Sequence, residues 1–304
     1  MRTPVKISLA VVGLVAVLAA AVTAGVLLLR PAFLFGPECT VPGDAAAAAT
    51  SPDVELTATQ LQHASTINAV GLSRGVPDRG RVIAIATAYQ ESTLRNLPNG
   101  DRDSVGLFQQ RPSQGWGTAQ QIGDPVYASN KFYDALLEVP DWQKLPLTKA
   151  AQAVQYSAFP DAYAQWEPRA TTLVRALSGD STLQLSCRAD ASAPTADHPK
   201  RPPPAGADKA TPALAAVLSS ADAEFGGLTV GSVSADGRTG TASLTATELA
   251  PTAAGRSLAA WAVAHSAGLG VNEVATAEQR WVDHEWQTAA KAIDAGQVQI
   301  TTAG

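Results

Sequence analysis

Apolar residues form one long uninterrupted run near the start of the chain of 304 residues. The run covers positions 7–29, contains no charged residue and follows Arg2 and Lys6. At about 1.5 Å per residue, a helix of this length crosses a bilayer. Basic residues on its N-terminal side favour a cytoplasmic N-terminus. We therefore expect a single-pass protein of the cell membrane, with a cytoplasmic tip (1–6), a transmembrane anchor (7–29) and the bulk of the chain extracytoplasmic. The alternative is a cleaved signal peptide, because positions 22–24 are small residues.

Behind this run, the spacing of apolar positions is helical. Thr57 and Gln60 predict a capping box, followed by apolar residues three apart from Leu61 to Val70. The segment 81–90 is apolar on nearly every side, which is typical of a buried helix. We expect a helical domain at 54–187, with further helices at 126–137, 147–157 and 163–177.

Two segments rich in Pro and small residues divide the exported chain. Residues 30–53 predict a tether, and 188–211 predict a semi-rigid Pro-rich linker. We expect these segments to separate independently folding parts, and the last of them, 212–304, to be a small non-catalytic α+β domain. Its patterns predict helices at 212–224 and 254–267, a hairpin of 228–234 and 241–247 around Asp236-Gly237, and strands at 271–274 and 298–302.

The composition narrows the class of partner. The net charge of −5 argues against nucleic-acid binding, which needs a basic surface. The chain has two cysteines, Cys39 and Cys187, and outside the cytoplasm we expect them to form a disulfide. Neither lies in a CxxC motif, and the four histidines are scattered, so we expect no metal site and no cofactor.

Glu91 is the first candidate for chemistry. It ends the apolar helix expected at 81–90, where burial and the helix C-terminus both disfavour a carboxylate anion. A carboxyl that stays protonated near neutral pH can give its proton to a glycosidic oxygen. The alternative is an exposed Glu91 that pairs with Arg95 four residues later.

The residues after Glu91 carry a resemblance. The segment from Glu91 to Pro112 reads ESTLRNLPNGDRDSVGLFQQRP. It resembles the lytic transglycosylase family of the lysozyme-like superfamily, in which a Glu-Ser pair ends a buried helix. In that family a polar loop, a Ser-x-Gly-Leu-Met-Gln motif and a nearby Pro follow. Here Glu91-Ser92 matches the pair, 104–109 (SVGLFQ) matches the motif, and Phe108 replaces Met.

A third family element, Ala-x-x-Tyr-Asn on a later helix, is matched less well. Tyr156 looks like the family Tyr, but Ser157 stands where Asn is usual. The resemblance covers roughly residues 60–175 and implies a lysozyme-like helical domain at 54–187, within a chain that is mainly α.

The resemblance also implies an activity and a site. The activity is cleavage of the MurNAc–GlcNAc β-1,4 bond in peptidoglycan glycan strands, with Glu91 as the single general acid and base. The motif places Ser92 and Ser104 in the substrate site, and Tyr156 follows from the third element. The side chains of Gln109 and Gln110 offer hydrogen-bond donors and acceptors to sugars, and Trp116 offers an apolar face.

Two further functions stay open. A lysozyme-like muramidase would hydrolyse the same bond with Asp101 or Asp103 as its second carboxylate, although both residues are also typical of turns. A catalytically silent glycan-binding or scaffolding module of a wall-spanning assembly is the third hypothesis. In the C-terminal part, Trp281 and Trp286 belong either to the core or to an exposed pair that binds wall polymer or a partner.

Overall fold

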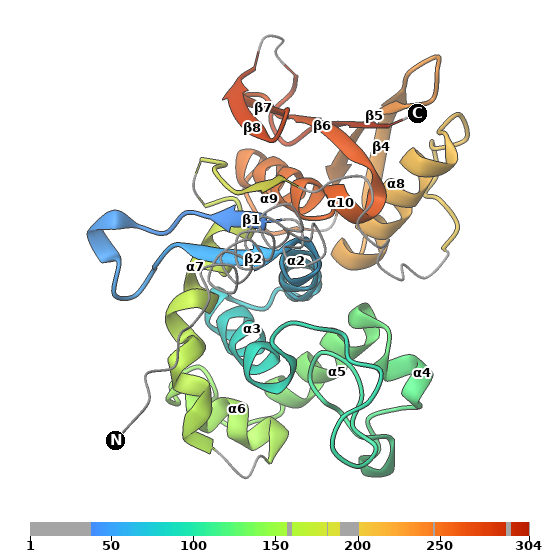
Figure 1. Ribbon diagram of the computed structural model, residues 1–304. Helices are drawn as coiled ribbons and strands as arrows, with labels where there is room; N and C mark the ends of the chain where they lie inside the picture. Colours follow the sequence, from blue (N-terminus) through green and yellow to red (C-terminus); the bar gives the residue numbers. More distant parts are fainter. Residues whose placement is uncertain are drawn as a thin grey trace, which may run out of the picture. The chain divides into compact units, whose positions relative to one another are not determined.

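A computed structural model describes residues 38–156, 160–180, 182–188, 201–245, 247–289 and 293–303. The predicted anchor at 7–29 lies outside these residues. Within the ranges just given, no helix combines the length and the apolar character needed to cross a bilayer. All of the described residues belong to one compact unit (Figure 1).

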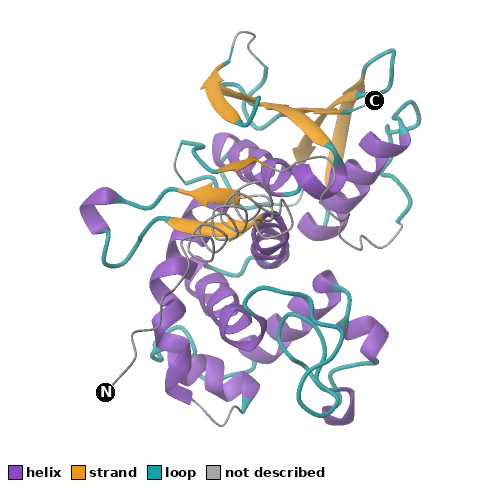
Figure 2. Ribbon diagram, viewed as in Figure 1, coloured by secondary structure: helices purple, strands orange, loops and turns teal. Residues whose placement is uncertain are grey.

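The fold class expected from the sequence is wrong. The described residues contain two antiparallel sheets, one of three strands and one of six, as well as their helices (Figure 2). The chain is therefore not mainly α, and the segment expected to be a lysozyme-like helical domain, 54–187, also contains strands. Strands of three or four residues account for the error, because they are too short to show an alternating pattern.

The three-stranded sheet joins both ends of the segment that we expected to be helical. Strand β1 (Glu38–Val41) pairs with β2 (Val54–Thr57) on one side and with β3 (Ser186–Arg188) on the other. Cys39 lies directly opposite Cys187 and is bonded to it, so the predicted disulfide is confirmed. Part of the predicted tether thus belongs to a sheet, and a short 3₁₀ helix, η1 (Ala45–Ala47), follows β1.

Helix α2 (Ala58–Ser73) lies at the centre of the fold. The capping box of Thr57 and Gln60 is confirmed at its start. Twelve of its residues are buried, because helices pack on most of its sides. Around it lie α3 (Asp78–Ser92), α5 (Pro125–Leu137) and α7 (Glu167–Leu177). Between these come η2 (Pro112–Gln114), α4 (Ala119–Ile122), α6 (Leu147–Gln155) and η3 (Pro160–Trp166).

The C-terminal residues add helices to a six-stranded sheet. Helices α8 (Pro212–Phe225) and α9 (Pro251–Ala264) pack on it, and α10 (Ser266–Leu269) follows α9. The predicted hairpin is confirmed as β4 (Leu228–Val233) and β5 (Thr239–Leu244). The other strands are β6 (Val271–Ala275), β7 (Gln279–Val282), β8 (Glu285–Thr288) and β9 (Val298–Thr302). The order of strands in this sheet is β4-β5-β9-β6-β7-β8. The β7–β8 hairpin at one edge was not predicted.

The helices before and after the predicted linker pack on one another. Helix α2 contacts both α8 and α9, and α7 also contacts α9. The carbonyl of Leu177, at the end of α7, accepts hydrogen bonds from Asn68 of α2 (3.1 Å) and from Ser257 of α9 (2.7 Å). One hydrophobic core runs through both parts. The domain boundaries at 54–187, 188–211 and 212–304 stay predictions.

Candidate active site

Glu91 lies in the last turn of α3 and is half-buried. The hydroxyl of Tyr163, a fully buried residue of η3, donates a hydrogen bond of 2.7 Å to its carboxylate. The side-chain amide of Gln155, the last residue of α6, donates a second hydrogen bond. Three elements from distant parts of the sequence therefore meet at this carboxyl group.

The pKa of Glu91 is raised above its ordinary value. Burial is the largest cause, because it disfavours the anion. The hydrogen bonds from Tyr163 and Gln155 act in the opposite direction, because they stabilise the charged form. Burial outweighs both, so the carboxyl keeps its proton to a higher pH than an exposed glutamate. The same group becomes a hydrogen-bonded carboxylate once it has released the proton.

The loop that follows α3 is held close to Glu91 by two hydrogen bonds. The hydroxyl of Ser92, which is 4% exposed, donates to the carbonyl of Leu107 at 2.7 Å. The amide of Gln155 donates to the next carbonyl, that of Phe108, at 2.8 Å. Ser92, which follows Glu91 in the chain, and Gln155, which contacts its carboxylate, thus both anchor the SVGLFQ segment. This arrangement explains why a Ser directly after Glu91 and the distant motif occur together.

The SVGLFQ segment forms a tight turn on a buried base. Gly106 has φ of +80°, and a Cβ there would lie 2.7 Å from the carbonyl oxygen of Ile122, so only glycine fits. Leu107 and Phe108 are fully buried, and the ring of Phe108 stacks on Phe132 of α5 with centroids 4.6 Å apart. The Phe that replaces the family Met therefore contributes to the core under the loop.

The structure places the other predicted substrate residues in different environments. Ser104 and Gln110 are buried, at 7% and 2% exposure, and the amide of Gln110 donates to the carbonyl of Ala128 in α5. Gln109 is half-buried with φ of +47° and donates to the carbonyl of Gly106. Trp116 is half-buried against the core. Gln110 acts as an anchor of the loop here, whereas Gln109 and Trp116 keep part of their surface accessible.

Tyr156, the tyrosine that the resemblance points to, has a largely exposed side chain. It is 85% exposed, has φ of +52°, and caps the C-terminus of α6. Ser157, which stands where the family has Asn, lies outside the described residues. The tyrosine that contacts Glu91 is Tyr163. Sequence reasoning missed both Tyr163 and Gln155, although Gln155 lies in the very stretch that was compared with the family.

Neither candidate for a second carboxylate is bonded to the Glu91 cluster. The side chain of Asp101 is 94% exposed, and its nearest cation is that of Arg102, 3.9 Å away. Asp103 accepts hydrogen bonds from Arg111 (2.7 Å) and from the backbone of Ser113 (2.8 Å), and these hold its pKa well below the usual range. A carboxylate with so low a pKa is a weak base toward water.

Nothing in the described part of the chain gathers three metal-binding side chains. A comparison of the chain with protein-family models and with curated proteins gave no match. One carboxyl of raised pKa, held by two hydrogen-bond donors beside an ordered polar loop, can transfer a proton in either direction.

Proposed function

We propose that the protein cleaves the glycan strands of peptidoglycan by a lytic transglycosylase mechanism with Glu91 as its one general acid and base. The observation that supports this most is the environment of Glu91, whose pKa burial raises while Tyr163 and Gln155 stabilise the anion. The resemblance of the Glu-Ser pair and of the SVGLFQ segment to that family supplies the substrate class.

In the proposed mechanism, protonated Glu91 gives its proton to the oxygen of the MurNAc–GlcNAc bond. That bond breaks, and the leaving sugar departs as an alcohol. The Glu91 carboxylate, held by Tyr163 and Gln155, then removes the proton from the 6-hydroxyl of the muramoyl residue. The 6-oxygen attacks the anomeric carbon, so the product is a 1,6-anhydro sugar and Glu91 is protonated again.

The state of Asp103 favours the transglycosylase over the muramidase. A hydrolase needs a second carboxylate as nucleophile or base. Asp103 is instead paired with Arg111, and Asp101 is almost fully exposed. The protein would be active outside the cytoplasm, where its disulfide is stable, with peptidoglycan as its partner and the membrane contacted through residues 7–29.

Glu91→Gln tests the proposal, because it keeps the size of the side chain but removes the transferable proton. Digestion of purified peptidoglycan should slow by about 10²–10⁴-fold. Glu138→Gln makes the same change at an exposed position after α5 and should leave the rate unchanged. Mass analysis of the wild-type products should give anhydromuramoyl ends, which are one water lighter than reducing ends.

Two results would contradict this proposal in different ways. Reducing ends, together with loss of activity in Asp101→Asn or Asp103→Asn, would identify a hydrolase. If the wild type and Glu91→Gln both bind glycan and neither cleaves it, the protein is the silent binding module. The thermal stability of Glu91→Gln should not fall at neutral pH, because a neutral amide avoids the cost of burying an anion.

A further inference from the structure

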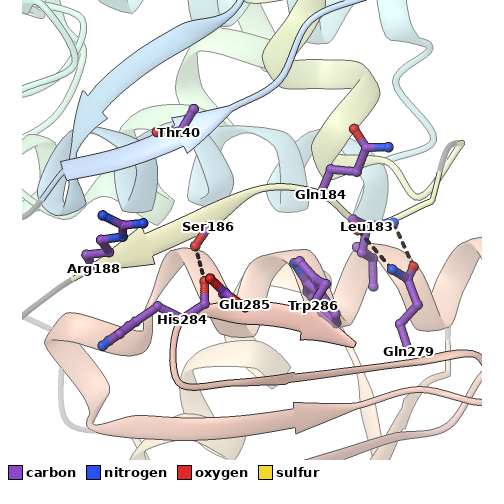
Figure 3. Close-up of a pocket in the computed structure, with 9 residues that line it drawn as sticks. All are labelled: Thr40, Leu183, Gln184, Ser186, Arg188, Gln279, His284, Glu285 and Trp286. Carbon is purple, nitrogen blue, oxygen red and sulfur yellow. Dashed lines mark hydrogen bonds between the residues drawn. The ribbon is translucent and has the colours of Figure 1, made fainter. Parts of the chain in front are cut away.

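A cavity of about 610 Å³ lies where the three-stranded sheet meets the β7–β8 hairpin, and it shares no lining residue with the Glu91 site. Figure 3 shows the β3 segment passing between Thr40 of β1 and the side chains of the hairpin. The volume of the cavity lies within the range of small-molecule sites, about 300–1,000 Å³. Most of its lining side chains are polar, and Trp286 supplies an aromatic surface.

One wall of the cavity is fixed by hydrogen bonds between hairpin side chains and the outer edge of the β3 segment. The amide of Gln279 accepts from the backbone N–H of Leu183 and donates to its carbonyl, both at 3.0 Å. The indole N–H of Trp286 donates to the carbonyl of Leu185 at 2.8 Å. These contacts fix the position of the Trp286 ring before any ligand is present, which lowers the entropic cost of binding.

The turn of the hairpin is held in an unfavourable conformation at the same place. Asp283 and His284 form its two-residue turn, and both have positive φ, at +51° and +67°. Turns of this kind favour Asn, Asp or Gly at the first position and Gly at the second, so His284 is the residue that departs from the preference. His284 is fixed by a 2.8 Å contact of its Nδ1 with the carbonyl of Cys187, and its own carbonyl accepts from the hydroxyl of Ser186. Strained backbone that is held this way is typical of binding sites.

A second set of lining side chains has no bonded partner among the residues that the structure describes. The side chains of Thr40, Gln184, Arg188 and Glu285 form no hydrogen bond or ion pair with any other described residue. Gln184 and Arg188 alternate with buried residues along the β3 segment, so they lie on the exposed face of the sheet. Together the four side chains offer hydroxyl, amide, guanidinium and carboxylate groups to one ligand.

We propose that this cavity is a saccharide-binding site, separate from Glu91. A simple anion is disfavoured by Glu285, and a simple cation is disfavoured by Arg188. A neutral sugar fits the mixture, because its hydroxyl and acetamido groups both donate and accept hydrogen bonds. The face of Trp286 can cover the apolar side of a sugar ring. This site does not require that Glu91 cleave anything.

The test is NMR titration of the full-length chain, kept in mild detergent, with the soluble tetramer of N-acetylglucosamine. The indole N–H of Trp286 and the amides of β3 should shift on titration. Gln184→Ala with Glu285→Ala should raise the Kd obtained from these shifts by about tenfold or more, since two hydrogen-bonding groups are lost. Both positions are exposed, so the hydrogen bonds that fix the wall remain.

Glu138→Ala with Gln143→Ala removes the same two groups at exposed positions outside the cavity and should leave the titration unchanged. Glu91→Gln should also leave the shifts at Trp286 unchanged, so the outcome is independent of the proposed enzyme activity. Shifts confined to residues near Glu91, or no shift at Trp286 at millimolar probe, would overturn the proposal. It would also be overturned if a neutral tetrapeptide shifted Trp286 and the sugar did not.

Discussion

Tyr163 is the side chain that most directly controls the protonation of Glu91. Its hydroxyl stabilises the anion, so Tyr163→Phe should raise the pKa of Glu91 further. The general acid works only while protonated, and its pKa sets the alkaline limb of the pH–rate profile. We therefore expect that limb to move to higher pH in Tyr163→Phe, measured as peptidoglycan digestion across a pH series.

Tyr156→Phe is the matched control for this prediction. It removes the same hydroxyl from a ring that is 85% exposed, so the profile should stay where it is. If Tyr156→Phe moves the limb and Tyr163→Phe does not, the tyrosine implied by the family resemblance is the functional one. The arrangement around Glu91 would then have to change when substrate binds.

Some of the candidate site could be predicted at the residue scale and some could not. Glu91 was predicted from the end of an apolar helix together with the motif that follows it, and both are local signals. Tyr163 and Gln155 approach it only after η3 and α6 have packed on α3, and no spacing in the sequence encodes that contact. Buried Gln110 illustrates the opposite error, because amide chemistry suited to a sugar also suits an internal carbonyl.

At the scale of elements, the join between α3 and its loop stores strain. Thr93 and Leu94 follow Ser92 with φ of +54° and +56°, which β-branched Thr rarely adopts. Two side chains of helix α2 hold these residues in place. The amide of Gln60 donates to the carbonyl of Thr93 at 2.9 Å, and Nδ1 of His63 lies 2.7 Å from the carbonyl oxygen of Leu94. The end of the Glu91 helix is therefore fixed from α2.

Thr93→Gly should relieve this strain. We expect the free energy of unfolding to rise by about 0.5–1 kcal/mol, because glycine adopts positive φ without a steric cost while its greater freedom when unfolded offsets part of the gain. Thr59→Gly, at an exposed position in α2, should instead lower it by about 0.3–0.5 kcal/mol, because glycine favours a helix less than threonine does. Urea denaturation of both variants measures the difference. Equal destabilisation would show that the left-handed pair carries no strain.

The Cys39–Cys187 disulfide should contribute strongly to stability. It joins β1 to β3, so it closes a loop of 148 positions. Reduction should lower the free energy of unfolding by about 2–5 kcal/mol, mainly by releasing the unfolded chain. Urea denaturation with and without reductant measures the loss. Cys39→Ala with Cys187→Ala should match the reduced protein and show no further response to reductant, and a wild-type midpoint unaffected by reduction would contradict the prediction.

The elements that sequence reasoning found are those with long patterns of their own. Helix α5 and the β4–β5 hairpin were predicted within a few residues, because apolar spacing and the Asp236-Gly237 turn are both local. Strands β1 and β3 are short and exist through pairing across the whole segment. The β7–β8 hairpin was missed because Asp283-His284 is not a typical turn sequence, and packing against the β3 segment holds it in place.

At the scale of the whole molecule, the packing of α2 and α7 on α8 and α9 changes the expectation for folding. The sequence suggested two independently folding parts joined by a Pro-rich linker. A continuous core and the hydrogen bonds that meet at the carbonyl of Leu177 now favour one cooperative transition. A cut within 188–211 should therefore leave two fragments that stay associated on gel filtration.

A substitution at Gly179 tests directly whether the two parts unfold together. Gly179 follows α7 with φ of +76°, and a Cβ there would overlap the backbone carbonyl of Ala253 in α9. Gly75 has φ of +63° with open space around it, so Gly75→Ala measures backbone strain alone, about 1–2 kcal/mol. Gly179→Ala should cost about 1–3 kcal/mol more, because the α7–α9 contact must open.

Amide hydrogen exchange measures which helices lose stability in Gly179→Ala. If the parts unfold as one unit, Gly179→Ala should lower the protection of core amides in α2 and in α9 by the same factor, because both exchange through the same global opening. The slowest amides of α3, which lie beside Glu91, should follow them. Loss of protection in α9 alone, with α2 and α3 unchanged, would show that the C-terminal part unfolds by itself and that the contact with α2 adds little to stability.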